Sequence, residues 1–206
     1  MARRLNTQTR QHILDTARQL FTERGFDNTS LKDIALAAGI SPGTLFYHYS
    51  SKSNLIFDVT DQYFNQLTHR LVEWVGEANS VEALQGAIST PNQILRYVFN
   101  AIVNDTLRGK LHHYLIEQAV SCDPAMRTRF LQKYQEWRQM IEEGVTPFVP
   151  NPDERRLLAH IIASVLDGLV IQSILGAPDL PVDAVADYLA DTAVRGQMSE
   201  AGSPYQ

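Results

Sequence analysis

Residues 29–52, TSLKDIALAAGISPGTLFYHYSSK, decide the fold we expect, because they read as two short helices joined by a tight turn. Ser30 is placed to cap the first helix, and Asp33, three residues later, completes a capping box. Gly39 ends this helix, because the residue beyond the last turn often needs the left-handed conformation that glycine adopts without cost. The apolar residues between these signals fall on one helical face: Leu31, Ile34, Ala35 and Ala38.

The second helix of this stretch has an equally clear start signal. Ser41 offers a capping hydroxyl, and Pro42 occupies the first helical position, where its missing N–H is not needed. We expect this helix to run to about Tyr49. Helix, glycine turn and a short second helix of small and hydrogen-bonding residues are typical of a helix-turn-helix. In that motif the second helix enters the major groove of DNA and presents its N-terminal residues to base edges.

The same residues resemble the DNA-binding segment of the tetracycline-repressor (TetR/AcrR) family, whose recurring form is T-S-L-x-D-I-A-x-x-A-G-I-S-x-G-T-L-Y-Y-H-F-x-S-K-x-x-L. The resemblance covers nearly every position from Gly25 to Leu55, without a gap, and extends upstream through R-x-x-I-L-D-T-A-R-Q-L-F. Two aromatic residues depart from this form, since Phe46 stands where tyrosine is common and Tyr49 where phenylalanine is common. A phenol at position 46 would often reach a phosphate, and this chain lacks it.

Composition sets bounds that agree with a soluble regulator. The 206 residues suit one or two small domains, with 44% hydrophobic and 20% charged residues. We expect no membrane span, because no apolar run approaches about 20 residues, and the N-terminus lacks the apolar stretch of a signal peptide. Cys122 is the single cysteine, which excludes an internal disulfide and a cysteine-rich metal site. These features predict a cytoplasmic protein.

The net charge of −5 argues at first against a nucleic-acid binder, but its distribution does not. Residues 1–60 hold seven Lys and Arg against five Asp and Glu, whereas the remainder holds eleven against eighteen. The basic excess therefore lies in the part that carries the helix-turn-helix. A basic head on an acidic body fits a DNA binder with a modest electrostatic footprint.

The helical periodicity predicts an all-α fold of nine or ten helices, with a DNA-binding domain at 1–52 and an effector-binding and dimerisation domain at 53–206. Residues 1–6 read as a loose basic arm, 146–152 as a stiff extended connector, and 198–206 as a disordered tail. Cap-plus-proline signals predict helix starts near 91, 124 and 152. The remaining helices are expected at about 7–24, 51–77, 81–87, 107–121 and 181–195.

Residues with the reach to contact DNA gather in and around the motif. Pro42, Gly43 and Thr44 open the second helix, where glycine lets the backbone approach the groove and threonine offers a hydroxyl and a methyl. Taken alone, each of these residues would be an ordinary surface residue. Helix capping by itself would also explain Thr29 and Ser30. The other proposed contacts, mostly to phosphates, are Thr29, Ser30, Lys32, Tyr47, His48 and Lys52.

The helix predicted at about 153–175 is the most apolar of the chain and covers more than one narrow stripe. A helix apolar on two adjoining faces needs two sets of neighbours, one of which we expect to be a second copy of the protein. The family resemblance implies paired C-terminal helices in a four-helix dimer interface. The alternative is a helix wholly buried within a monomer. The interface residues predicted are Leu158, Ile162, Val165, Leu169, Val185 and Leu189.

The body is where a small molecule would act, although most of its aromatic residues are expected in an ordinary core. Tyr134, Trp137 and Met140 share adjoining helical positions and are the best candidates for a pocket wall. The full set predicted to line an effector pocket is Phe64, Phe99, Tyr114, Tyr134, Trp137 and Met140. His112 and His113 are adjacent and point in different directions on a helix, so no metal site and no cofactor are predicted.

These observations predict a transcriptional regulator that is not an enzyme, because no phosphate-cradling loop, HExxH or nucleophile elbow is present. The resemblance implies a homodimeric repressor that binds a palindromic operator and is released by a small-molecule effector. Two alternatives stay open. One is a regulator without an effector, and the other is a helical enzyme or ligand carrier whose helix-turn-helix no longer binds DNA.

Overall fold

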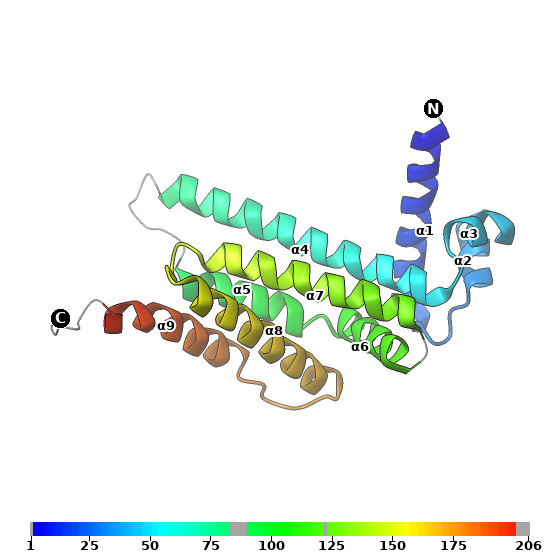
Figure 1. The fold of residues 1–206 in the computed structure, drawn as a ribbon. Coiled ribbons are helices and arrows are strands. Elements are labelled where there is room, and N and C mark those ends of the chain that lie inside the picture. The colour runs from blue at the N-terminus through cyan, green and yellow to red at the C-terminus, as the bar shows by residue number, and fades with distance from the viewer. Residues whose placement is uncertain (1, 83–89, 122, 201–206) are drawn as a thin grey trace. The chain divides into compact units, whose positions relative to one another are not determined.

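The structure is a computed structural model that describes residues 2–82, 90–121 and 123–200. All regular secondary structure in these ranges is helical, as the sequence predicts (Figure 1). The nine helices of the described ranges are α1 (Ala2–Arg24), α2 (Leu31–Ala37), α3 (Pro42–His48), α4 (Lys52–Glu82), α5 (Pro91–Val103), α6 (Thr106–Ser121), α7 (Pro124–Val145), α8 (Pro152–Ile174) and α9 (Val182–Glu200).

The chain divides into two compact units. The first, which we call the head unit, comprises Met1–Asn65 and Lys110–Arg127. The second, the body unit, comprises Gln66–Gly109 and Thr128–Gln206. Helices α4, α6 and α7 each contribute residues to both units.

The core of the head unit comes from the apolar stripes that the sequence predicts. Helix α1 buries Ile13 and Phe21, and α2, α3 and α4 bury Ile34, Leu45 and Leu55. The stripe of α1 recurs every three to four residues, which places its members on one face. Burial of these side chains from four helices fixes the helix-turn-helix on its support helix.

Local capping sets the ends of the motif helices. The Ser30 hydroxyl accepts a hydrogen bond from the Asp33 N–H at 3.2 Å, and the Asp33 carboxylate accepts from the Ser30 N–H at 2.8 Å. This is the predicted capping box, and its hydrogen bonds from Ser30 hold the pKa of the Asp33 carboxyl below its ordinary value. Gly39 has φ of +64°, which explains why glycine ends the first motif helix.

The body unit is built around α5, α8 and α9, with the closest association between α5 and α9 (Figure 1). Ile162, Leu169 and Val170 of α8 are buried, as are Phe99 of α5 and Ala186 of α9. Hydrogen bonds between polar side chains also connect α5 and α9 at the edge of this contact. We call these residues the polar ladder: Asn92, Arg96 and Asn100 of α5 and Asp183, Asp187 and Asp191 of α9. Both sets are spaced by four residues, so the two helices meet along matching faces.

Helices α6 and α8 approach closely at Gly109. A Cβ atom at this position would lie 2.8 Å from the Ile174 Cγ2 atom and 3.0 Å from the Val170 Cγ1 atom. These distances are shorter than van der Waals contact, so only glycine fits without a shift of α8 side chains.

Several predicted segments differ in the structure. Residues 2–6 continue α1 and do not form a loose arm. Residues 146–148 form turns that hydrogen-bond back to α7, and Pro152 already belongs to α8, so only residues 149–151 of the predicted connector lie outside helices and turns. Helix α9 includes 198–200 of the predicted tail. The short helix predicted at 81–87 falls mostly outside the described residues, and 81 and 82 belong to α4.

Among the described residues, α8 is the one helix whose length and hydropathy would suffice to cross a membrane. One such helix is weak evidence, because core helices of soluble proteins pass the same test. The Asp167 carboxylate on α8 accepts a hydrogen bond from the Tyr134 hydroxyl at 2.6 Å, which shows that this face of α8 is packed against protein. We therefore interpret α8 as a packing helix.

Candidate nucleic-acid interface

Helix α3 presents its first turn to solvent. The Ser41 hydroxyl accepts a hydrogen bond from the Thr44 N–H at 3.0 Å and lies 2.9 Å from the Thr44 hydroxyl. Leu45 is fully buried and anchors the helix, whereas Pro42, Gly43 and Thr44 are exposed. The backbone of the first turn is therefore free to approach a partner surface.

Gly43 has no internal structural requirement for glycine. A Cβ atom at this position would lie 3.7 Å from the Ser41 Oγ atom, which is an ordinary contact, and φ is not positive. The neighbouring protein atoms therefore leave room for a methyl group. A need for glycine here must come from something that approaches α3 from outside.

Tyr47 lies one turn after Gly43 and Thr44 on the same face of α3 and is 78% exposed. The His48 ring is half-buried and meets the Tyr47 ring edge-on, with centroids 5.3 Å apart and planes at 84°. This contact limits the orientations of the phenol. The structure thus brings Gly43, Thr44, Tyr47 and His48 together on one short helix, as the sequence predicts.

Two of the three residues predicted to contact DNA from the α2 side are exposed. Lys32 and Ser30 are exposed at the start of α2. Thr29 is only 1% exposed, and its hydroxyl donates to the Gly25 carbonyl at 2.8 Å. Because its side chain is buried and paired, we withdraw Thr29 from the set of DNA contacts, and its role is to close the turn between α1 and α2.

Lys52 also has an internal partner. Its ammonium donates a hydrogen bond to the Phe26 carbonyl and lies 5.8 Å from the centroid of the Phe26 ring. Partial burial lowers the pKa of Lys52, which the Asp27 carboxylate partly offsets. Lys52 therefore ties the start of α4 to the turn after α1. An ammonium has three donors, so this bond still leaves capacity for a phosphate.

Sequence reasoning missed a second polar connection in the head unit. The Arg10 Nε atom donates to the Tyr49 hydroxyl at 3.2 Å, and its Nη2 atom lies 2.5 Å from the Asp58 Oδ2 atom. Burial, followed by the Asp58 charge, raises the pKa of Tyr49 to about 12. The departure from phenylalanine at position 49 was the only sequence signal for this contact.

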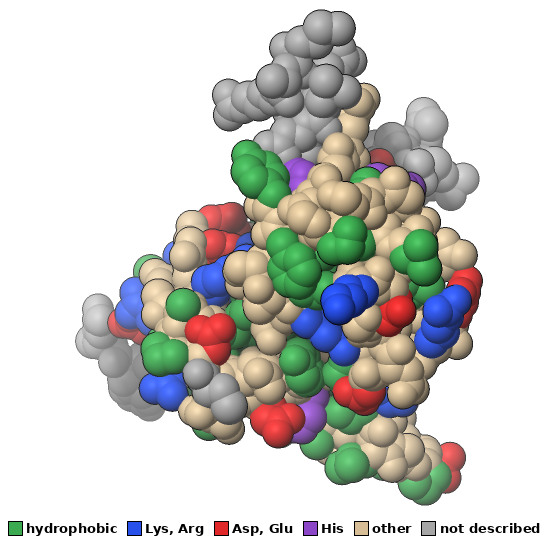
Figure 2. Space-filling model, turned by 90° about the vertical axis from the view of Figure 1, so that its right-hand side faces the viewer, with side chains coloured by type: hydrophobic (Ala, Val, Ile, Leu, Met, Phe, Trp, Pro, Cys, Tyr) green, Lys and Arg blue, Asp and Glu red, His purple; other side chains and the backbone are tan. Residues whose placement is uncertain are grey.

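Figure 2 shows one face of the molecule, on which Lys and Arg side chains are interspersed with Asp, Glu, apolar and uncharged ones. On this face, and among the described residues, they do not merge into a continuous basic surface. This distribution agrees with the small basic excess of residues 1–60. Protein–DNA affinity would then depend on a few phosphate contacts together with base contacts.

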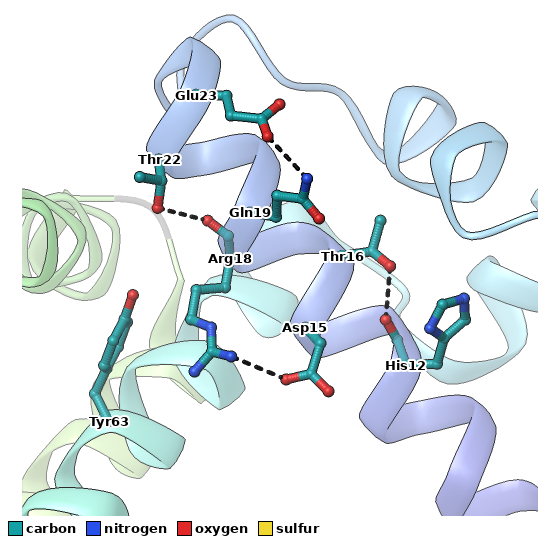
Figure 3. A pocket seen from close by; sticks show the side chains of 8 residues that line it. All are labelled: His12, Asp15, Thr16, Arg18, Gln19, Thr22, Glu23 and Tyr63. Atoms are coloured by element: carbon teal, nitrogen blue, oxygen red, sulfur yellow. Dashed lines mark hydrogen bonds and ion pairs between the residues drawn. The ribbon is translucent and has the colours of Figure 1, made fainter.

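A solvent-open hollow of about 470 Å³ lies between α1 and Tyr63 of α4 (Figure 3). Most of its polar side chains are already paired within α1, including Arg18 with Asp15 at 3.4 Å and Gln19 with Glu23 at 2.8 Å. None of the predicted effector residues lines it. We therefore assign no ligand to this hollow.

The six predicted effector residues belong to both units. Phe64 and Tyr114 lie in the head unit, and the Tyr114 ring is 5.2 Å from the Phe26 ring. Phe99 is fully buried in the body unit, which indicates a core role, and Met140 is partly exposed. The six residues are therefore divided between two compact units.

Tyr134 and Trp137 do meet, as the sequence predicts. Their ring centroids are 5.2 Å apart in an edge-on arrangement, and the Tyr134 hydroxyl donates to Asp167 at 2.6 Å. Burial, followed by the Asp167 charge, raises the pKa of Tyr134. A carboxylate within so apolar a helix needs a partner where it is shielded from water, and Tyr134 is a partner of Asp167. These three residues form the aromatic–acid cluster of the body unit.

The six residues predicted to form the dimer interface differ in how much of their surface the single chain leaves open. Ile162, Leu169 and Leu189 are each no more than 8% exposed within a single chain, and Leu158, Val165 and Val185 are partly covered. The exposed apolar positions of α8 are displaced by one residue. These exposed apolar residues are Leu157, Ile161 and Ile171 of α8 and its C-cap residue Leu175. We define the α8 seam as these four residues together with the exposed Ser164 and the partly exposed Gly168, which lie between them.

An all-helical chain with a capped helix-turn-helix and an exposed first turn of its second helix has the features of a DNA-binding transcriptional regulator. Residues 13–59 match the family described as "Bacterial regulatory proteins, tetR family". Residues 115–197 match "BetI-type transcriptional repressor, C-terminal". The chain belongs to the TetR/AcrR family of transcriptional regulators, and it is therefore a regulator and not an enzyme.

Individual relatives agree over nearly the whole chain. The "HTH-type transcriptional regulator AcrR" of Shigella flexneri is 28% identical over 194 residues, covering 89% of this chain and 86% of that protein. Thermus thermophilus FadR in complex with lauroyl-CoA is 21% identical with a TM-score of 0.65, covering 91% and 94% of the two chains. A Saccharomonospora viridis regulator in complex with choline is 22% identical with a TM-score of 0.62, covering 90% and 95%. The two structures support the fold.

Proposed function

We propose that this regulator is a homodimeric, ligand-responsive repressor that binds a palindromic operator through α3 and acts in the cytoplasm. The observation that carries the proposal is the exposed first turn of α3 with Gly43 open to approach. Thr44 and Tyr47 would contact base edges, whereas Ser30, Lys32, His48 and Lys52 would bind phosphates. Pro42 would bring the backbone of the first turn to the groove.

Dimerisation is supported by the α8 seam. Its residues are spaced 4-3-4-3-4, which is the spacing of the a and d positions in a coiled coil. Leu157 and Leu175 at its ends are 61% and 79% exposed, and Ile161 and Ile171 are 39% and 42% exposed. Ser164 and Gly168 at its centre are small, and a Cβ at Gly168 would meet no atom within 4 Å. A second copy of α8 could therefore approach closely there.

A two-fold dimer would place two α3 helices in successive major grooves and would make the operator palindromic. The experiment that tests this function is selection of bound sequences from a random DNA pool by the full chain at moderate salt. We expect a palindromic consensus that binds at least about 1,000-fold more tightly than random DNA. Binding that selects no sequence and disappears with salt would contradict the proposal.

Matched variants test whether α3 recognises the operator sequence. Thr44→Ala and Tyr47→Ala are expected to weaken the operator more than random DNA, whereas Lys32→Ala weakens both and reduces the salt dependence. Lys110→Ala, an exposed lysine of α6, is the charge-matched control. If all four variants behaved alike, α3 would not be the reading helix.

The effector is proposed to bind in the body. Two structural relatives bind choline and lauroyl-CoA respectively, which differ in charge and size. The aromatic–acid cluster of Tyr134, Trp137 and Asp167 favours a small cation, because aromatic faces and a carboxylate attract quaternary ammonium groups.

Titration of the operator complex with choline and with lauroyl-CoA tests the effector class. We expect choline to release the operator in the wild type and to lose this effect in Asp167→Asn. Release by lauroyl-CoA alone would instead indicate an acyl-chain pocket. If neither compound changed operator affinity, both proposed effector classes would be excluded, and a regulator without an effector would become the better description.

A further inference from the structure

The end of the recognition helix is held by polar side chains from two other helices. Tyr49 is the C-cap residue of α3, and its N–H donates to the Leu45 carbonyl at 2.8 Å. Its hydroxyl accepts from the Arg10 Nε atom of α1 at 3.2 Å. The same guanidinium reaches the Asp58 carboxylate of α4 at 2.5 Å through Nη2. We call Arg10, Tyr49 and Asp58 the Arg10 clamp.

The chemistry of the clamp suits a rigid connection. A guanidinium is planar and keeps Nε and Nη2 at a fixed separation, so its two bonds fix the phenol relative to the carboxylate. Tyr49 is only 3% exposed, and the Asp58 side chain is 13% exposed, so water competes little for these two acceptors. The clamp therefore connects the end of α3 to both α1 and α4 within the head unit.

The Tyr49 hydroxyl is not required to fill the core. Phenylalanine, which is common at this position in the recurring form of the family, would occupy nearly the same space. The hydroxyl instead gives Arg10 a second acceptor besides Asp58. The hydroxyl thus fixes the position of the end of α3 through a directional hydrogen bond, whereas the ring fills space in the core.

Small rotations of α3 matter for base readout. Helix α3 has seven residues, and Gly43 and Tyr49 are separated by about 9 Å along the axis at ~1.5 Å per residue. A tilt of about 10° at the clamped end would displace the first turn by roughly 1.5 Å, which exceeds the tolerance of a hydrogen bond. Flexible lysine contacts to phosphates would tolerate the same displacement.

We propose that Arg10, Tyr49 and Asp58 are positioning residues that hold α3 at the angle required for sequence-specific DNA contacts. The proposal rests on the proposed DNA recognition by α3 and adds residues that do not themselves touch bases. It requires that loss of the clamp weakens operator binding while binding to random DNA is retained. This separation distinguishes positioning from a general loss of folded protein, which would weaken both.

Direct phosphate binding by Arg10 makes a different prediction. Its side chain is 55% exposed, and three of its five N–H donors are not used in the clamp bonds described above. If Arg10 bound a phosphate, its removal would weaken operator and random DNA equally and reduce the salt dependence of both. The two hypotheses differ most clearly for Asp58→Asn, because removing a negative charge near DNA would by itself strengthen binding.

The experiment uses the full-length protein and the operator obtained by selection with the wild type. Affinity for the operator and for random DNA is measured at two salt concentrations for Arg10→Met, Tyr49→Phe and Asp58→Asn, together with thermal unfolding. Arg18→Met and Asp15→Asn are the matched controls, because this pair is also an arginine and a carboxylate on α1 but connects no other helix.

We expect Tyr49→Phe to lose about threefold to tenfold in operator affinity, and Arg10→Met and Asp58→Asn to lose about tenfold to a hundredfold. Affinity for random DNA should stay within about twofold of the wild type in all three, and the controls should change neither affinity. Unchanged operator affinity in the clamp variants, equal losses on both DNAs, or tighter operator binding by Asp58→Asn would each overturn the clamp. Failure of the wild type to select any operator would instead refute the proposed DNA recognition.

Discussion

The protein interior does not explain why residue 43 is glycine, and its place in the first turn of α3 makes it informative about DNA. The structure leaves ordinary space for a Cβ, and alanine is favoured over glycine in a helix by about 0.5–1 kcal/mol. We predict that Gly43→Ala keeps or raises the thermal midpoint but lowers operator affinity about tenfold or more, because the methyl group separates α3 from the groove.

Gly144→Ala is the control for this substitution, since Gly144 lies near the end of α7 and a Cβ added there would meet no atom within 4 Å. It should affect stability to a similar extent and leave operator affinity unchanged. Unaltered operator binding by Gly43→Ala would mean that the first turn of α3 does not approach DNA closely.

Residue-level expectations succeeded where the responsible interaction is local in sequence. The capping box of α2, the Gly39 turn and the Ser41 cap depend on residues a few positions apart, so the sequence alone determines them. The Arg10–Tyr49 bond joins residues 39 positions apart, and the burial of Thr29 depends on the packing of the turn. No periodicity in the sequence signals such contacts.

At the scale of helices, the crossing of α6 and α8 depends on Gly109. A methyl group would lie 2.8 Å from Ile174 and 3.0 Å from Val170, so side chains of α8 would have to move. We predict that Gly109→Ala destabilises the protein by about 1–3 kcal/mol, measured as the free energy of unfolding in urea. Gly144→Ala is again the control, and equal effects of the two substitutions would show that the crossing is loose.

The polar ladder between α5 and α9 predicts sensitivity to acid. The hydrogen bond from Arg96 holds the pKa of the Asp187 carboxyl below its ordinary value of 3.8. A lowered carboxyl pKa stabilises the fold at pH values above 3.8, and this stabilisation is lost as pH falls below 3.8 through the pKa of the folded state. We therefore expect the wild type to lose more stability than Asp187→Asn between pH 5 and about 2.5.

Thermal unfolding of both proteins across this range measures the effect. Asp153→Asn is the control, because Asp153 pairs with Arg156 within α8 alone. Parallel curves for the wild type and Asp187→Asn would show that the ladder does not contribute to stability at neutral pH.

The sequence predicted where most helices occur, but it did not always predict which face of a helix points into the core. Cap-plus-proline signals placed the starts of α5, α7 and α8 correctly, because they are local and strong. The exposed apolar residues of α8 lie one position before the residues predicted for the interface. A helix that is apolar nearly all round does not indicate from its own sequence which face points inward. Only the observed burial of Ile162 and Leu169 separates the inner face from the α8 seam.

At the scale of the whole molecule, dimerisation determines whether two recognition helices can act together. Ile161 lies within the α8 seam, and we predict that Ile161→Glu converts the dimer to a monomer, because two carboxylates would face each other across an apolar contact. The mass in solution, measured by light scattering or sedimentation, should halve. The helical content should stay the same, since Ile161 is partly exposed in the single chain.

The same substitution should weaken operator binding strongly. Two linked heads bind their half-sites with a high effective concentration, so separation of the heads lowers affinity by about 100-fold or more even when each head is intact. Leu131→Glu is the matched control, because Leu131 is an exposed leucine of α7 outside the seam. A dimer that persists in Ile161→Glu, or that is lost equally in Leu131→Glu, would place the interface elsewhere. If Ile161→Glu were monomeric yet bound the full operator as tightly as the wild type, a single head would suffice for recognition, and the palindromic mode of binding would be wrong.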